Sequence, residues 1–302
     1  MKYYRVLEQF GKTHLCVETS DGVLTSLTSV NDLVNSYEDL LDVADISGIT
    51  VDNLTKNVLA QGKGVTFDLT ELIKWSIKKS GPACIIKPIE PEEMWAGGLG
   101  NMIMDEEALA NANEDTRLAY NTPSISTTIY KGTNHRLVGP FDKIGIREDT
   151  ERTIAEGEIV FIIYKGKFAG ISTGNEVAGT LAGLSSNWAV PSKVFKGCAS
   201  IGPCILSLED VKSPLELHLE LKQFRGGNQI GQSNLITKFK RTPEEIIAST
   251  VAHDAPPKVV IQYTGGFVVA KDGDDIASLE KGDVVRISLE GVGSVENEVE
   301  VV

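Results

Sequence analysis

The 302-residue chain carries 42 acidic and 29 basic side chains, so its formal charge at pH 7 is −13. Duplex nucleic acids and anionic membranes require a positive surface. Because no Lys/Arg-rich run supplies one, we expect neither as a partner. No stretch approaches the roughly 18 apolar residues that cross a bilayer, and the first residues lack an apolar signal core, so we expect a cytoplasmic protein.

The four cysteines and four histidines are scattered along the chain. Their spacing matches neither a disulfide framework nor a zinc site built on histidine or on paired cysteines. If the protein holds a metal ion, oxygen ligands must bind it. Oxygen ligands favour Mg²⁺, with Mn²⁺ and Ca²⁺ as the other choices.

Residues 1–84 are predicted to form a small α+β domain. Residues 3–27 alternate in polarity around a Ser-Asp-Gly turn, which is typical of a hairpin. Residues 31–44 have the apolar spacing of a helix, and a second helix is predicted to begin at Asp68 and to end before Gly81. The Gly-Pro pair that follows marks the boundary.

Residues 85–302 are mostly strand-like and are predicted to form the larger domain. The continuous apolar run Ile159–Tyr164 indicates a strand that is buried on both faces. A turn at residues 165–167 returns the chain, and Leu215–Phe224 alternates in the manner of a half-buried strand. The fold class is therefore a β-rich α+β protein whose strands close into a barrel or folded roll.

A group of carboxylates precedes and follows the buried strand. Glu156 and Glu158 are two residues apart on a strand, so their side chains point to the same face. An antiparallel return from the turn at residues 165–167 brings Glu176 beside them. Like charges held together require a cation or a proton between them. Solvated glutamates at the start of a strand are the alternative interpretation, but three carboxylates on neighbouring strands favour a Mg²⁺ site.

The order of several short motifs resembles the fumarylacetoacetate hydrolase superfamily, and in detail the branch that contains 2-keto-3-deoxy-D-arabinonate dehydratase. The resemblance covers roughly residues 85–302. The matching stretches are Pro91–Gly98, Ile129–Pro140, Glu156–Ile163, Ala169–Val177, Lys193 with Gly202-Pro203, Thr264–Gly266 and Leu279–Val285. Each motif alone is weak, whereas the ordered set is specific.

The resemblance implies a β-roll catalytic domain, a homodimer or homotetramer, one divalent cation and a 2-oxo acid substrate. It implies roles for eight residues, namely Glu156, Glu158 and Glu176 as metal ligands, Lys193 as the catalytic lysine, and Thr264, Gly265, Lys131 and Gly98 around the substrate. The cation would polarise the 2-oxo group and make the C3 protons more acidic. Lys193 would then act as a base or a charge stabiliser, the former if its pKa is lowered.

We therefore expect a Mg²⁺-dependent lyase that dehydrates a 2-keto-3-deoxy sugar acid through an enolate. An acylpyruvate-type carbon–carbon hydrolase or a 2-oxo acid decarboxylase is the first alternative. A homologue without catalysis that binds a metabolite or serves as a scaffold is the second, because one fold hosts several chemistries. Lys196 is the second choice for the catalytic lysine.

The sequence departs from the resembled pattern at several positions. Glu176 replaces the usual aspartate, which moves the carboxylate by roughly an ångström. Ala178–Leu181 replaces a stretch that usually contains an arginine and a carboxylate. Asn101, Asp105, Ala110 and Asn111 stand where pocket residues are usual, and we interpret Glu106, Glu107 and Glu114 as a solvated helix face. The metal-and-lysine centre is thus kept, while the residues that recognise the substrate differ.

Overall fold

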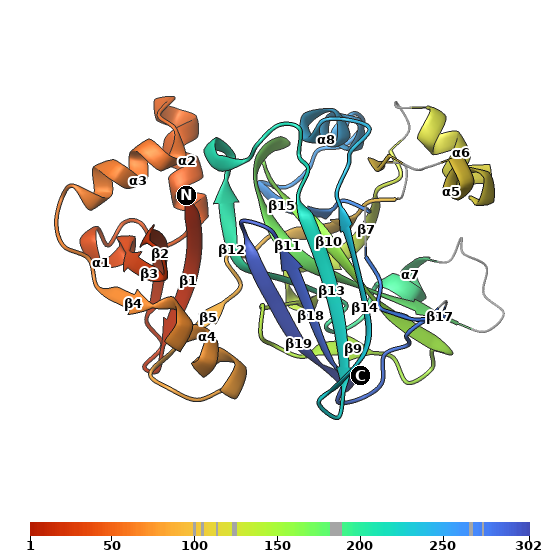
Figure 1. Ribbon diagram of the computed structural model, residues 1–302. Coiled ribbons are helices and arrows are strands. Elements are labelled where there is room, and N and C mark those ends of the chain that lie inside the picture. The colour runs from red at the N-terminus through yellow and green to blue at the C-terminus, as the bar shows by residue number, and fades with distance from the viewer. Residues whose placement is uncertain are drawn as a thin grey trace.

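The computed structural model describes residues 1–98, 101–103, 106–112, 114–122, 126–181, 189–265, 268–273 and 275–302. Within these residues the chain forms two β-sheets with helices at their edges (Figure 1). This arrangement confirms the strand-rich α+β class. None of the helices in these ranges is long and apolar enough to cross a membrane.

The N-terminal part pairs four strands with four helices, and it lies to one side of the remaining strands in Figure 1. Its elements are β1 (Lys2–Glu8), β2 (Thr13–Ser20), β3 (Val23–Ser26), α1 (Leu27–Val30), α2 (Tyr37–Ser47), α3 (Val51–Leu59), β4 (Thr66–Asp68) and α4 (Leu69–Lys78). The predicted hairpin is present as β2 and β3 around the Ser-Asp-Gly turn.

Helix α2 begins later than its apolar spacing predicts. The side chain of Ser36 accepts a hydrogen bond from the Asp39 N–H, and the Asp39 carboxylate accepts one from the Ser36 N–H. This reciprocal cap fixes the first turn at Tyr37, so Leu33 precedes the helix and is 80% exposed. The predicted helix at Asp68 is confirmed, because Asp68 caps α4 through the Glu71 N–H.

The larger sheet continues from the N-terminal strands into the rest of the chain. Its further elements are β5 (Ala83–Ile86), β6 (Glu93–Ala96), β7 (Ile129–Thr133), β8 (Leu137–Val138), β10 (Arg152–Tyr164), β11 (Lys167–Thr180), β12 (Ala199–Ser207) and β15 (Val259–Tyr263). Among the described residues the strand order is β4-β3-β2-β1-β12-β11-β10-β15-β6-β7. Strand β1 pairs with both β5 and β12, so the sheet runs across the predicted domain boundary between residues 84 and 85. That boundary stays a prediction.

The smaller sheet has the described order β17-β16-β14-β13-β18-β19-β9. Its strands are β9 (Ile144–Ile146), β13 (His218–Arg225), β14 (Asn228–Ile236), β16 (Lys271–Asp272), β17 (Asp275–Ile276), β18 (Val284–Leu289) and β19 (Gly293–Val301). The remaining helices are α5 (Glu106–Asn111), α6 (Glu114–Asn121), α7 (Ala189–Lys193) and α8 (Pro243–Val251). The sheets meet at Gly157 of β10, where a Cβ atom would lie 3.0 Å from Ile287 of β18.

The β10–β11 hairpin sets the position of the candidate site. The run Ile159–Ile163 is fully buried, as its sequence predicts. A two-residue turn follows, in which Lys165 and Gly166 both have positive φ (49° and 72°). Two such residues make the turn whose twist matches an antiparallel hairpin. One extra residue, Ala169, shifts the ladder between Ile162 and Ile163, and the resulting register places Glu156 directly opposite Glu176.

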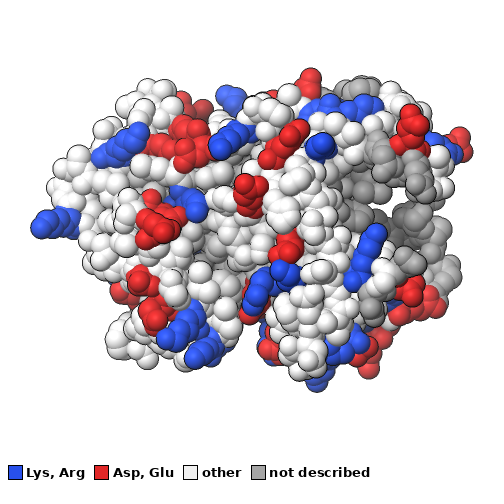
Figure 2. Space-filling view, in the orientation of Figure 1, with Lys and Arg blue, Asp and Glu red and all other residues white. Residues whose placement is uncertain are grey.

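Charges of both signs are interspersed on the face of the molecule that Figure 2 shows. Several surface charges of the described residues are paired in salt bridges, such as those of Lys143 with Glu298 and Lys196 with Glu300. Mixed charge of this kind fits the absence of a basic run in the sequence.

Candidate metal centre

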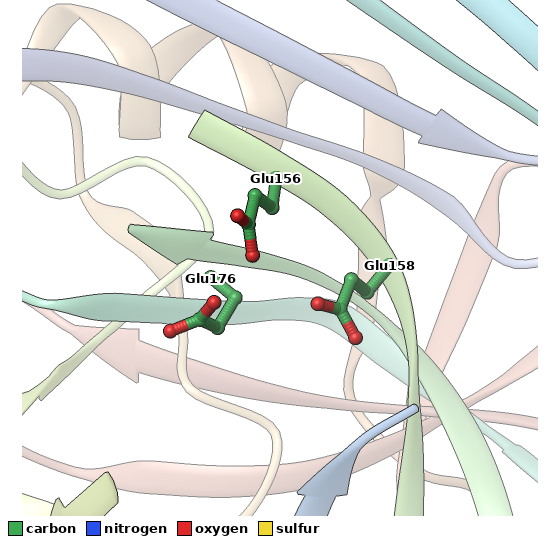
Figure 3. Close-up of side chains that lie close together, drawn as sticks. All are labelled: Glu156, Glu158 and Glu176. Carbon is green, nitrogen blue, oxygen red and sulfur yellow. The ribbon is translucent and has the colours of Figure 1, made fainter. Parts of the chain in front are cut away.

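Three glutamates converge where strands β10 and β11 lie side by side. Glu156 and Glu158 project from β10 and Glu176 from β11, with their carboxylates toward one another (Figure 3). One oxygen from each lies within 4.8 Å of the other two. The three residues are 1–7% exposed. The convergence that strand geometry predicts is therefore present, and the carboxylates are not splayed into solvent.

The packing beside Glu158 depends on a glycine. Gly174 lies opposite Glu158 in the ladder. A Cβ atom there would come within 2.6 Å of the Tyr263 ring and 2.3 Å of Val160. The absent side chain lets the Tyr263 ring fill the space next to the carboxylate. Any larger residue at position 174 would displace that ring or the strand that carries Glu158.

Two lysines balance part of the negative charge. Lys131 of β7 is fully buried, and its ammonium donates to Glu176, to the Val177 carbonyl at 3.0 Å and to the Lys193 carbonyl at 2.9 Å. Lys193, at the end of α7, contacts Glu176 and lies 3.1 Å from Glu156. When all five groups are ionised, the three carboxylates and two ammonium groups carry a net charge of −1, so the cluster favours a further cation once the glutamates have lost their protons.

The sequence predicts Lys131 among the substrate-binding residues, and its contacts add a different role. An ammonium group has three donors, and all three are used within the protein. The pairing of Lys131 with Glu176 is therefore a feature that the sequence did not reveal. Nothing in the spacing of residues 131 and 176 indicates that β7 and β11 meet at this point.

Burial and the neighbouring charges shift the pKa values of the three glutamates in different directions. Burial raises the pKa of Glu156 well above its usual range, and the charge of Glu176 raises it further. The same two causes raise the pKa of Glu158 to about 8, against the N–H of Gly265, which donates to its Oε2 at 2.7 Å. Burial also acts on Glu176, but the ammonium groups of Lys131 and Lys193 outweigh it and lower that pKa. Glu176 is thus the carboxylate that stays ionised.

Lys193 keeps its proton in this arrangement. Burial lowers the pKa of its ammonium, but the charges of Glu176 and Glu156 outweigh burial and raise it above the usual value. The lowered pKa that a base would need is therefore not found, and the charge-stabilising role fits better. Lys196, the second choice, has a side chain that is 73% exposed and pairs with Glu300.

Thr264 and Gly265 follow β15, and Gly265 contacts Glu158, whereas Gly98 follows β6 and lies against Gly265. The hydroxyl of Thr264 is buried and finds no hydrogen-bond partner among the described residues. Gly265 has φ +74°, and a Cβ atom there would lie 2.4 Å from the carbonyl oxygens of Gly97 and Gly98. Its N–H holds Glu158. Gly98 donates to Thr127 at 3.1 Å, so the glycines allow close backbone packing and the threonine offers a free polar group.

The positions that depart from the resembled pattern differ in their surroundings. Asn101 is buried and donates to the Thr264 carbonyl at 3.1 Å, a contact that the sequence did not predict. Ala110, Asn111, Glu106 and Glu114 are exposed, as expected of a solvated face. Asp105 lies outside the described residues, as does the side chain of Glu107. Residues 178–180 continue β11.

The residues present fit a hard divalent cation. All three candidate ligands are carboxylates, the donors that Mg²⁺, Mn²⁺ and Ca²⁺ prefer. Thr264, whose neighbour Gly265 contacts Glu158, has a buried hydroxyl without a partner among the described residues, and such groups are rare unless a ligand or water completes them. The arrangement is that of an oxygen-ligand centre.

Comparison with known families identifies the fold family. The Fumarylacetoacetate (FAA) hydrolase C-terminal family matches residues 103–300, which include all three glutamates and both lysines. The chain therefore belongs to the fumarylacetoacetate hydrolase family, and the resemblance that its motifs indicate is confirmed.

Two curated relatives carry dehydratase names. The chain is 27% identical over 300 residues to a probable 2-keto-3-deoxyxylonate dehydratase of Haloferax volcanii, with 98% of this chain and 99% of the relative covered. It is 29% identical over 218 residues to 2-dehydro-3-deoxy-D-arabinonate dehydratase of Saccharolobus solfataricus, with 70% and 72% covered. The predicted branch of the family is thereby confirmed.

Solved structures share the fold along the whole chain. A structure of 2-keto-3-deoxy-D-arabinonate dehydratase complexed with magnesium and 2,5-dioxopentanoate has a TM-score of 0.79 at 23% identity, covering 100% of this chain and 99% of that one. The apo form of that enzyme has a TM-score of 0.77 at 21% identity with the same coverage. These likenesses show that the N-terminal part and the two sheets follow one common fold.

Proposed function

We propose that this protein is a Mg²⁺-dependent dehydratase of a 2-keto-3-deoxy sugar acid, with a five-carbon acid as the first candidate. The observation that carries the proposal is the convergence of Glu156, Glu158 and Glu176, with the Lys193 ammonium in contact with two of them. The names of the two relatives support the substrate class. The magnesium-bound structure of similar fold supports the choice of cation.

The three glutamates would hold the cation, whose chemistry is to polarise the 2-oxo group and so make the C3 protons more acidic. The free hydroxyl of Thr264 would donate to the substrate carboxylate. The Lys193 ammonium would stabilise the negative charge that develops when C3 loses its proton. Water would take the C3 proton, and the C4 hydroxyl would leave with a proton returned from water, so that the two steps together remove one water molecule from the substrate.

The proposal is tested by incubating the protein with Mg²⁺ and a panel of 2-keto-3-deoxy pentonates and hexonates while substrate loss is followed. We expect turnover of at least one pentonate and none after Mg²⁺ is removed by a chelator. Calorimetry shows in parallel whether Mg²⁺ binds. Bound Mg²⁺ without turnover across the panel would reject the dehydratase proposal.

The other expected chemistries enter the same assay. An acylpyruvate tests carbon–carbon hydrolysis, and oxaloacetate tests decarboxylation. A homologue without catalysis would turn over none of these compounds. The homodimeric or homotetrameric assembly and the cytoplasmic location stay predictions.

A further inference from the structure

Thr264 is held at its backbone on three sides while its side chain is left free. The Thr264 N–H donates to the Ile159 carbonyl at 3.2 Å, and the next N–H, that of Gly265, donates to Glu158 at 2.7 Å. Both partners belong to β10. The third contact comes from outside the hairpin, because the Thr264 carbonyl accepts a hydrogen bond from the Asn101 side chain at 3.1 Å.

The orientation of the Asn101 amide is fixed by Arg241. The Arg241 guanidinium donates to Oδ1 of Asn101. A guanidinium has donors and no acceptor, so the amide oxygen must face Arg241 and the NH₂ group must face Thr264. Asn101 is 2% exposed, so water does not compete freely for either end. Arg241 thus determines which group Asn101 presents to the Thr264 carbonyl.

Both residues are anchored to the fold away from the metal centre. The Asn101 carbonyl accepts from the Lys240 N–H at 3.0 Å, and the Ile103 N–H donates to the Lys238 carbonyl at 2.8 Å. Arg241 also donates to the hydroxyl of Ser249 on α8 at 3.3 Å. A short antiparallel pairing and helix α8 therefore support the two side chains, which makes them a rigid brace rather than a surface contact.

We propose that Asn101 and Arg241 are positioning residues that hold Thr264 in register and thereby set the affinity for the carboxylate of the substrate. The inference deepens the proposed function and depends on the role of Thr264 in it. A free hydroxyl binds a carboxylate well only when the backbone that carries it is fixed, because small displacements of a positioned group are costly. Asn101 stands where the resembled pattern has a pocket residue, and in the structure it contacts the backbone of Thr264.

The test measures binding of Mg²⁺ and of oxalate, an analogue of the 2-oxo acid end, by calorimetry. The variants are Asn101→Leu, Arg241→Met, Thr264→Val and the double variant N101L/T264V. Asn53→Leu, on the exposed face of α3, is the matched control. We expect Asn101→Leu to weaken oxalate binding about tenfold, as for the loss of one hydrogen bond, with Mg²⁺ affinity unchanged. Arg241→Met should act in the same direction.

The double variant separates positioning from a general loss of structure. If Asn101 acts through Thr264, the double variant binds oxalate no more weakly than Thr264→Val alone. Any of three results would overturn the inference. The effects of the two substitutions on oxalate affinity could multiply in the double variant, the Asn101→Leu protein could bind oxalate with normal affinity, or it could lose Mg²⁺ binding as well. Wild-type protein that binds Mg²⁺ and oxalate but turns over no sugar acid would reject only the proposed reaction. Wild-type protein that binds Mg²⁺ but not oxalate would reject both.

Discussion

The β10–β11 hairpin carries one group of charges at each end, and the two groups differ mainly in burial. At the open end lies the buried cluster, made of Glu156, Glu158, Glu176, Lys131 and Lys193. At the turn lies the turn cluster, made of Glu38, Asp42, Asp45, Lys165 and Lys258. In the turn cluster Lys258 contacts Asp42 at 2.7 Å and Glu38 at 2.6 Å, and every side chain is 34–49% exposed.

The difference shows what burial adds to similar charge pairs. In the turn cluster, the Lys258 and Tyr164 hydrogen bonds outweigh slight burial and lower the pKa of Asp42. Water screens the group, and neither Asp42 nor Asp45 is forced to keep a proton. In the buried cluster the pKa values of the carboxylates move apart, since that of Glu158 is raised and that of Glu176 is lowered. Such divergent pKa values are typical of sites that bind ions or transfer protons.

The largest expected effect is the loss of catalysis in Lys193→Met. Removing the charge-stabilising ammonium should lower kcat about 100- to 1,000-fold. Mg²⁺ binding should persist or tighten, because this ammonium contacts two of the three carboxylates and repels an incoming cation. Enzyme assays and calorimetry check the two halves. Lys196→Met, three residues away and exposed, is the control and should retain full activity.

The next effect concerns stability, and compares the same substitution in the two clusters. Lys131→Met removes a fully buried ammonium and leaves Glu176 with one cation fewer. Breaking a buried ion pair costs about 3–5 kcal/mol, so chemical denaturation should show a loss of that order. Added Mg²⁺ should restore part of it. If Lys131→Met lost no more unfolding free energy than Lys258→Met, burial would not be what distinguishes the stability contributions of the two clusters.

Much of the buried cluster was predictable from sequence because it depends on one hairpin. The apolar run Ile159–Tyr164 and the turn at Lys165 predict the hairpin. The extra residue Ala169, which the sequence did not predict, then brings Glu176 opposite Glu156. Contacts between distant elements were not predictable. Lys131 meets Glu176 from β7, which joins the hairpin only through β15 and β6.

The same limit applies to the brace behind Thr264 and to the first turn of α2. Asn101 reaches Thr264 across 163 residues, and no local pattern records such a contact. Apolar spacing alone extended α2 back to residue 31, whereas the reciprocal cap of Ser36 and Asp39 decides where the helix begins. Local hydrogen bonds and long-range packing, rather than periodicity, determine these details.

Mg²⁺ affinity should rise with pH in the buried cluster. Burial first, and then the charge of Glu176, raise the pKa of Glu158 to about 8, and a carboxylate must lose its proton to bind a metal. Below pH 8, each unit of pH should weaken binding by up to about tenfold for one proton. Calorimetry at pH 6, 7 and 8 measures this. Glu158→Gln should bind more weakly and lose the part of the dependence that Glu158 contributes, while the part due to Glu156 is kept. A flat wild-type profile would contradict the raised pKa of Glu158.

The smallest expected effect is that of Lys258→Met in the turn cluster. Exposed ion pairs contribute about 0–1 kcal/mol, so the loss of stability should lie in that range and shrink as salt is added.

The sign of the pH dependence of this contribution follows from the pKa shifts of the two partners. The folded-state pKa of Asp42 is lowered and that of Lys258 is raised by their mutual hydrogen bonds. The contribution is therefore present from about pH 4 to 10. It is lost as the pH falls through the Asp42 pKa or rises through that of Lys258. Chemical denaturation of the wild type and of Lys258→Met at pH 3, 7 and 11 measures the contribution. If the wild type were several kcal/mol more stable than the variant and salt did not reduce that difference, the ion pairs at the two ends of the hairpin would contribute equally to stability.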